Sequence, residues 1–199
     1  MNKNILLCGV GGQGTVLASK LLAASAMEIG EEVHSAETIG MAQRGGSVTS
    51  HLRIGNECYS PLIPEGEADI MLAFEPSEAV RNLRYLKKSG VVIVNNVPVK
   101  PVTESLNETG YDGIQMINYL KEKVENVIEV DASELLAPLG SSKYFNVAVL
   151  GVLIGTNMLG IDEQTVVEQI KKRVPERFLE IDMKAFNMGK QIGEGYEAK

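Results

Sequence analysis

A glycine-rich loop near the N-terminus has the residue types and spacing to bind a phosphate. Residues 9–14 read Gly-Val-Gly-Gly-Gln-Gly and lie between a short apolar run and a segment of helical periodicity. Glycines at the G-x-G-x-x-G spacing allow a tight turn and a close approach to the helix N-terminus, where free N–H groups and the helix dipole favour an anion. The loop predicts either an anion site or a glycine turn that only lets the helix pack on the sheet.

A dinucleotide is one anion that such a loop could bind. Glu37 follows Gly14 at about the distance expected of a carboxylate that binds a ribose hydroxyl. However, residues 37–46 contain too much glycine for the crossover helix of a dinucleotide half-site, and we interpret them as a structured loop. A P-loop is excluded, because Thr15-Val16 stands where Lys-Ser/Thr must bind phosphate and magnesium.

A second glycine-rich segment carries a guanidinium. Arg44 precedes Gly45 and Gly46, in a loop that we expect at the carboxyl edge of the sheet, beside the first glycine loop. The arginine could bind a carboxylate, phosphate or pyrophosphate, or it could be an ordinary exposed arginine before a strand. The candidate binding residues are therefore Gly9, Gly11, Gly12, Gln13, Gly14, Arg44, Gly45 and Gly46.

The other reactive side chains do not suggest a catalytic or metal site. Cys8 and Cys58 have no CxxC spacing, and two thiolates are too few for an iron–sulfur cluster that usually takes four. His34 and His51 have no metal-ligand partners at suitable spacing, and we expect His51 at a surface or an interface. No serine lies in a G-x-S-x-G context. We assign no catalytic residue and no metal ligand.

Strands and helices alternate along the chain in the way typical of an α/β fold. The predicted strands are 3–8, 32–36, 47–54, 57–59, 69–74, 91–94 and 127–130, and the predicted helices are 15–27, 76–88, 114–124, a short one capped by Ser133, 144–159, 162–173 and 178–192. The first helix joins strands 3–8 and 32–36 in a parallel βαβ unit, and Gly55-Asn56 turns 47–54 into a β-hairpin with 57–59. The sequence predicts one domain over 1–199, a three-layer α/β/α Rossmann-like mostly parallel sheet with a β-hairpin insertion and a helical C-terminus.

The amino-acid composition argues against some classes of binding partner. The chain has 199 residues, 44% of them hydrophobic, and a formal net charge of −7. The acidic balance and the absence of tryptophan argue against nucleic acid, which favours basic patches and stacking side chains, and against anionic membranes. The N-terminal apolar run is too short for a signal sequence, and no apolar run reaches the roughly 18 residues of a membrane span. We expect a cytoplasmic protein.

Five elements in order resemble one family over nearly the whole chain. They are the 9–14 loop, Arg44-Gly45-Gly46, the Asp69-Ile70 strand ending at Ala73, Asn146-x-x-x-Leu150-Gly151 and Ala185-Phe186-x-x-Gly189. This pattern resembles the gamma subunit or domain of 2-oxoacid:ferredoxin oxidoreductases, and residues 4–60 are most similar to the small (beta) subunit of indolepyruvate ferredoxin oxidoreductase. Asp182 departs from the pattern, which has Asn before the Ala-Phe pair.

The resemblance implies a subunit of an enzyme that decarboxylates a 2-oxoacid, such as indolepyruvate or pyruvate, to an acyl-CoA, carbon dioxide and reduced ferredoxin. In that family the thiamine diphosphate and the iron–sulfur clusters belong to larger partner subunits, so this chain alone would bind no cofactor and be inactive. CoA and ferredoxin would act through the complex, and the isolated chain could form a homodimer. The alternative is a free-standing nucleotide-binding dehydrogenase.

Overall fold

One mixed sheet forms the centre of the molecule, in a computed structural model that describes residues 1–39, 45–56, 58–99 and 110–197. The strands are Lys3–Val10 (β1), Val33–Ile39 (β2), Ser47–Ile54 (β3), Ala68–Ala73 (β4), Leu86–Asn95 (β5) and Asn126–Val130 (β6). Over the described residues these six strands have the spatial order β2-β3-β1-β4-β5-β6. β3 is antiparallel to both of its neighbours, whereas β1, β4, β5 and β6 are parallel to one another.

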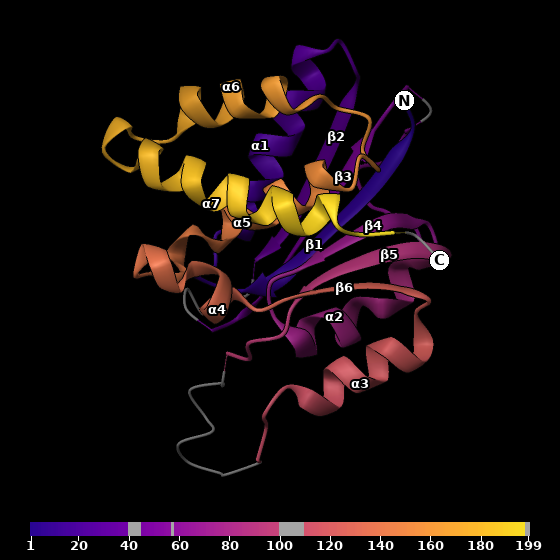
Figure 1. Cartoon of the computed structure of the whole chain (residues 1–199). Helices are drawn as coiled ribbons and strands as arrows, with labels where there is room; N and C mark the ends of the chain where they lie inside the picture. The colour runs from indigo at the N-terminus through magenta and orange to yellow at the C-terminus, as the bar shows by residue number, and fades with distance from the viewer. Residues whose placement is uncertain (40–44, 57, 100–109, 198–199) are drawn as a thin grey trace.

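Helices cover both faces of the sheet. The α-helices are Thr15–Glu28 (α1), Pro76–Asn82 (α2), Ile114–Lys123 (α3), Ala132–Leu136 (α4), Phe145–Gly155 (α5), Glu163–Arg173 (α6) and Glu176–Glu194 (α7), with 3-10 turns at Leu83–Tyr85 (η1), Ala137–Leu139 (η3) and Ser142–Tyr144 (η4). Figure 1 shows α1, α5, α6 and α7 on one face and α2 and α3 on the other. This arrangement confirms the predicted three-layer α/β/α fold with a helical C-terminus.

The central strand β1 has a continuous apolar sequence because both of its faces are covered. Ile5 and Leu7 are fully buried under the layer of α1, α5, α6 and α7. Leu6 and Cys8 are fully buried on the other face, under α2 and α3. Successive side chains of a strand point to opposite faces, so a strand between two helical layers has no polar alternation. The glycine loop that follows β1 therefore lies at the end of a strand in the interior of the sheet.

The predicted β-hairpin is wrong. Cys58 and Tyr59 lie outside any strand, and Gly55-Asn56 does not turn β3 back onto them. Instead β3 pairs along its length with β2 on one side and with β1 on the other. β2 has the predicted direction but is separated from β1 by β3. Two long neighbours satisfy more backbone groups of β3 and bury more of its apolar side chains than a three-residue strand would.

Two further boundaries differ from the predictions. The helix predicted over 76–88 ends at Asn82, and residues 86–90 belong to β5. Leu86 pairs with Ala68 of β4, so β5 starts earlier in the chain than predicted. Lys87 also forms an ion pair with Asp69 of β4, with 2.8 Å between Nζ and Oδ1. The cap of α4 is Asp131, not Ser133, since the Asp131 carboxylate accepts from the Ser133 and Glu134 amides.

Helices α5 and α7 cross in close contact through glycines. A Cβ atom built on Gly151 would overlap the carbonyl oxygen of Phe186, and one built on Gly189 would overlap that of Ala148. Both glycines belong to the sequence pattern that resembles the oxidoreductase gamma subunits. Their physical role is to let two backbones approach where any side chain would hold them apart.

Among the described residues no single helix is long and apolar enough to cross a membrane. The segments Ala132–Leu139 and Ser142–Gly155 reach the required length only as a pair, which is bent by 113°.

Candidate functional site

The two glycine-rich segments meet at the carboxyl end of β1. The Gly11 amide donates to the Gly46 carbonyl at 2.8 Å, and the Gly45 amide donates to the Gly11 carbonyl at 3.3 Å. These bonds continue the pairing of Val10 with Ser47 at the end of β1 and β3. Gly11, Gly45 and Gly46 are thus brought together, as the sequence analysis expected. Arg44 lies outside the described residues, and its binding role stays a prediction.

Gln13 holds the first glycine loop in shape. Its Oε1 accepts from the Val10 amide at 2.8 Å, and its Nε2 donates to the Phe74 carbonyl at 2.8 Å. Gly9 leaves room for this side chain, because a Cβ there would lie 2.7 Å from Gln13 Oε1 and 2.8 Å from Phe74 Cβ. Gln13 and Gly9 therefore link the loop to the end of β4 through contacts within the protein.

The N-terminus of α1 is open toward the loop. Gly14 caps it in the left-handed region, with φ of 83°, and among the described residues no side chain caps the first amides. Gly12 has φ of 100° and no other atom within 4 Å of an added Cβ. The first turn contains no acidic residue. Uncapped amides and the positive end of the helix dipole suit a phosphate or carboxylate, so the described geometry fits an anionic ligand.

A polar side chain and an orphaned hydroxyl lie next to this helix N-terminus. Asn146, at the start of α5, packs against Gly14, and a Cβ on that glycine would lie 2.8 Å from Asn146 Nδ2. The Thr15 hydroxyl is buried without a hydrogen-bond partner among the described residues. Gly14 is therefore needed for close packing as well as for the positive φ of the cap.

Two buried carboxylates form a network on the other side of the loop, which the sequence analysis missed. Glu75 caps α2 by accepting from the Ser77 and Glu78 amides, and it also accepts from the Tyr111 hydroxyl at 2.5 Å. Glu78 accepts from the Ser47 hydroxyl at 2.6 Å, so the network reaches the start of β3. Pro76 in the first turn was the only local signal in the sequence that a helix starts here. Tyr111 and Ser47 were not predictable, because they are distant along the chain.

This network affects the acidity of neighbouring groups. Burial and the bond to Glu75 raise the pKa of the Tyr111 hydroxyl above its ordinary value. Burial, reinforced by the charges of Glu78 and Glu75, raises the pKa of the Cys8 thiol well above its ordinary value. The Cys8 sulfur is therefore kept as an unreactive thiol, since nucleophilic attack requires the thiolate.

Glu37 does not occupy the position of a ribose-binding carboxylate. It pairs with Ser50 of β3, and Ser50 pairs with Leu7 of β1, so Glu37 is level with the middle of β1 and two strands away from it. In the dinucleotide-binding fold the strand that carries this carboxylate follows the first crossover helix and lies next to the first strand. The insertion of β3 therefore separates Glu37 from the glycine loop.

His51 is buried in β3, so its expected position at a surface or an interface is wrong. Its Nδ1 accepts from the Ile63 amide at 3.1 Å, and its ring packs edge-on against Tyr85. Burial lowers the pKa of the imidazole, so the unfolded chain binds a proton at this residue more readily than the folded chain. The free energy of unfolding should therefore fall as the pH drops through about 6.5, the imidazole's ordinary value.

Urea unfolding of His51→Asn between pH 5 and pH 8 tests this. The Asn oxygen replaces the Nδ1 acceptor, and we expect a weaker fall in stability on acidification than in the parent. A His51→Asn curve parallel to the parent's would contradict the assignment.

Metal-ligating residues do not gather in the described part of the chain: no group of three or more His, Cys, Asp or Glu residues could hold a metal ion there.

Residues 4–192 match the family of pyruvate ferredoxin/flavodoxin oxidoreductases. The indolepyruvate oxidoreductase subunit IorB of Archaeoglobus fulgidus is 40% identical over 95% of this chain and 94% of that protein. IorB of Pyrococcus horikoshii is 38% identical over 94% of this chain and 93% of that protein.

A solved structure shares the fold at low sequence identity. The gamma subunit of the keto/oxoacid ferredoxin oxidoreductase of Geobacter sulfurreducens has a TM-score of 0.70 and 21% identity, covering 98% of this chain and 99% of that one. The family match spans most of the chain and agrees with the six-stranded α/β fold. The chain therefore belongs to the pyruvate ferredoxin/flavodoxin oxidoreductase family, as a subunit of a 2-oxoacid:ferredoxin oxidoreductase.

Proposed function

We propose that this chain is the small subunit of an indolepyruvate-type 2-oxoacid:ferredoxin oxidoreductase, and that it places the joined glycine loops against a larger subunit or against CoA. The observation that carries the proposal is the uncapped N-terminus of α1 beside Gly11, Gly45 and Gly46, at the carboxyl edge of the sheet. Ligands of open α/β sheets bind at this edge. The identity with IorB proteins supports indolepyruvate as the oxoacid.

The family resemblance implies how the work is divided between the subunits of the proposed complex. The larger subunit would hold thiamine diphosphate and the iron–sulfur clusters, and ferredoxin would accept electrons there. CoA supplies the thiol that accepts the acyl group. In this chain the open amides at the start of α1 would hold a phosphate group, and Gly12 would leave space for it. Gln13 would keep the loop in the binding conformation.

A free-standing dehydrogenase is the second candidate. The glycine spacing favours it, but the position of Glu37 on the edge strand β2 argues against it. Calorimetry with NAD and NADP separates the two functions, since we expect no binding of either at micromolar concentration. Tight binding of either would support the dehydrogenase.

Activity should require the partner. We expect the isolated chain to be colourless and to reduce no viologen dye, and we expect viologen reduction with indolepyruvate and CoA after the larger subunit is added. Co-purification from the native cell with stoichiometric iron analysis checks this. Iron–sulfur absorbance in the isolated chain would contradict the assignment of the clusters to the partner.

Gly12→Val tests the glycine loop directly. A β-branched side chain would fill the space above the α1 amides. We therefore expect the KM for CoA or the subunit dissociation constant to rise by more than the about 10- to 150-fold that Arg44→Ala, the loss of one charge-assisted hydrogen bond, would cause. Both constants are to be measured in the reconstituted complex.

Gly66→Val is the matched control, because Gly66 also has a positive φ of 75° and open space around it but lies before β4, at the opposite edge of the sheet. Gly66→Val shares the backbone strain and should leave both constants unchanged. If Gly12→Val and the parent have the same KM for CoA and the same subunit dissociation constant, the loop has only a structural role.

A further inference from the structure

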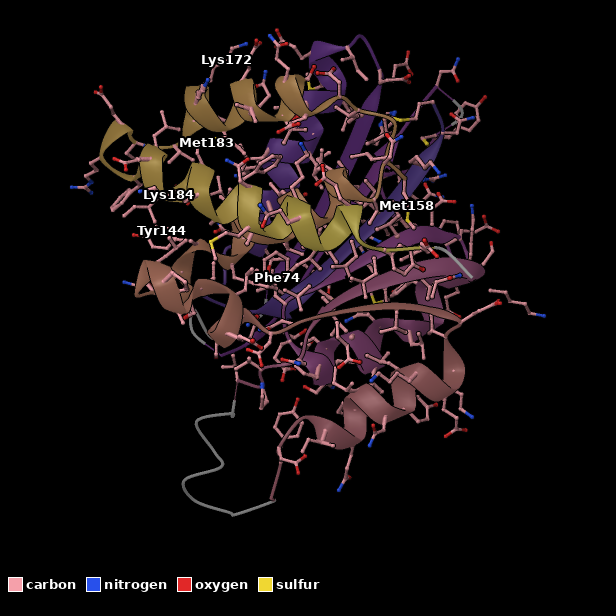
Figure 2. The ribbon with its side chains drawn as sticks, viewed as in Figure 1. Phe74, Tyr144, Met158, Lys172, Met183 and Lys184 are labelled. Atoms are coloured by element: carbon pink, nitrogen blue, oxygen red, sulfur yellow. The ribbon has the colours of Figure 1, made fainter. Side chains whose placement is uncertain are left out.

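A cavity of about 370 Å³ lies between the first turn of α1, the start of α5 and the start of α7. Its volume is within the roughly 300–1,000 Å³ typical of small-molecule sites. Its apolar lining comes mainly from Leu17, Val147, Val174 and Phe178. Figure 2 shows Tyr144, another lining residue, at the end of the helical layer that also holds Met183 and Lys184 of α7.

Two buried polar side chains line this cavity without a partner. Asp182 of α7 is 6% exposed and Asn146 of α5 is 7% exposed, and neither side chain has a hydrogen bond or ion pair within the described residues. Polar groups this deep in a protein are normally satisfied by a protein group, water or a ligand. The cavity wall therefore presents a carboxyl group and an amide, neither of which has a partner within the described residues.

Two cationic side chains, opposite in charge to an ionised Asp182, line the same cavity. Lys143 of η4 and Arg173 at the end of α6 line it and are exposed. Neither forms an ion pair among the described residues, and the Arg173 guanidinium donates only to the neutral Gln169 side chain. These cations are long and exposed, and they can turn toward an anion at the cavity.

From this arrangement we propose that the cavity binds a free α-amino acid with an apolar side chain. The ammonium group donates to Asp182 and Asn146 Oδ1, the carboxylate pairs with Lys143 or Arg173, and the side chain packs on Leu17 and Phe178. A carboxylic acid without the ammonium leaves Asp182 facing acceptors only. An amine without the carboxylate is repelled by the two cations. Only the zwitterion complements both ends of the cavity.

The proposal does not depend on the proposed function, because binding can be measured on the full chain without its partner. Calorimetry with L-phenylalanine should give a dissociation constant in the millimolar range or tighter, about −4 kcal/mol or better. Phenethylamine lacks the carboxylate, 3-phenylpropanoate lacks the ammonium and phenylpyruvate carries an acceptor in its place. Each should bind at least about tenfold more weakly, because one charge-assisted contact is lost.

Variants locate the site. Asp182→Asn keeps the size of the side chain and removes its carboxylate, and it should weaken L-phenylalanine binding about 10- to 150-fold. Lys143→Gln changes an exposed side chain that folding does not need, and it should also weaken binding. Lys171→Gln on α6 lies outside the cavity and is the matched control, with no change expected.

Three outcomes overturn the proposal. The first is no heat with L-phenylalanine up to about 10 mM, beyond the range in which such a site would be recognised. The second is equal binding by the parent and Asp182→Asn. The third is binding of phenylpyruvate or 3-phenylpropanoate as tightly as L-phenylalanine, which would make this an organic-acid site.

Discussion

Gly151→Ala should lower the free energy of unfolding by about 3 kcal/mol or more, at the upper end of overpacking costs, because the new methyl group overlaps a backbone carbonyl. The Phe186 carbonyl cannot turn away as a flexible side chain can, so α5 and α7 must move apart. The Phe186 ring, fully buried on α7, would lose contacts with the core as they separate. For a chain of this size the loss corresponds to a fall in melting temperature of about 6–12 °C.

A second glycine and a control make this test specific. Gly189→Ala places a methyl group against the Ala148 carbonyl from the opposite helix and should destabilise similarly. Gly195, just past α7, has φ of −81° and no atom closer than 3.6 Å to an added Cβ. Gly195→Ala should stay within about 0.5 kcal/mol of the parent. Urea unfolding measures all three, and a Gly151→Ala protein as stable as Gly195→Ala would mean that the helices do not cross this closely.

Phe74→Ala should cost about 3–5 kcal/mol, because it removes a fully buried aromatic ring and leaves a cavity. The Phe74 ring meets the Phe145 ring edge-on at 5.7 Å between centroids, so it links the end of β4 to the start of α5. Figure 2 places Phe74 between the sheet and the helical layer. Because its carbonyl also accepts from Gln13, a shift of the backbone here should weaken the glycine loop as well as the core.

The measurement is urea unfolding of Phe74→Ala beside Phe74→Leu and Tyr59→Ala. Phe74→Leu keeps most of the apolar volume and should lose less stability than Phe74→Ala. Tyr59 is 98% exposed, so Tyr59→Ala removes an aromatic ring that packs on nothing and should change stability by no more than about 0.5 kcal/mol. A loss for Phe74→Ala no larger than that for Tyr59→Ala would rule out the described packing.

The hydrophobic pattern along the chain predicted those strands and helices that have a clear sequence signal of their own. β1, β4 and β6 were recognised because buried parallel strands have short apolar sequences, and α1 because a glycine turn precedes it. The hairpin was misplaced because Gly55-Asn56 is a strong turn signal, yet pairing with β1 decides where β3 goes. Lys87 and Lys88 gave the start of β5 a polar sequence typical of a helix surface. Its pairing with β4 lies beyond what periodicity can indicate.

The candidate site also has a part that the sequence could predict and a part that it could not. The glycine loop was predictable, because a tight turn into a helix requires residues with positive φ at fixed spacing. The bonds between Gly11 and the segment at 45–46 followed from the topology of the sheet rather than from spacing. The bond between Tyr111 and Glu75 and the unpaired state of Asp182 depend on tertiary packing, for which a single sequence has no signal.

The position of β1 has a consequence for how the chain folds during synthesis. Both of its neighbours in the sheet, β3 and β4, come later in the chain, so the apolar strand has no pairing partner until residue 54 and lacks its second partner until residue 73. At typical translation rates, β1 waits about 3–13 s on the nascent chain before both of its edges can be paired. An unpaired apolar strand is a template for aggregation. Chaperone capture of the nascent N-terminal segment is therefore expected while the edges of β1 are unpaired.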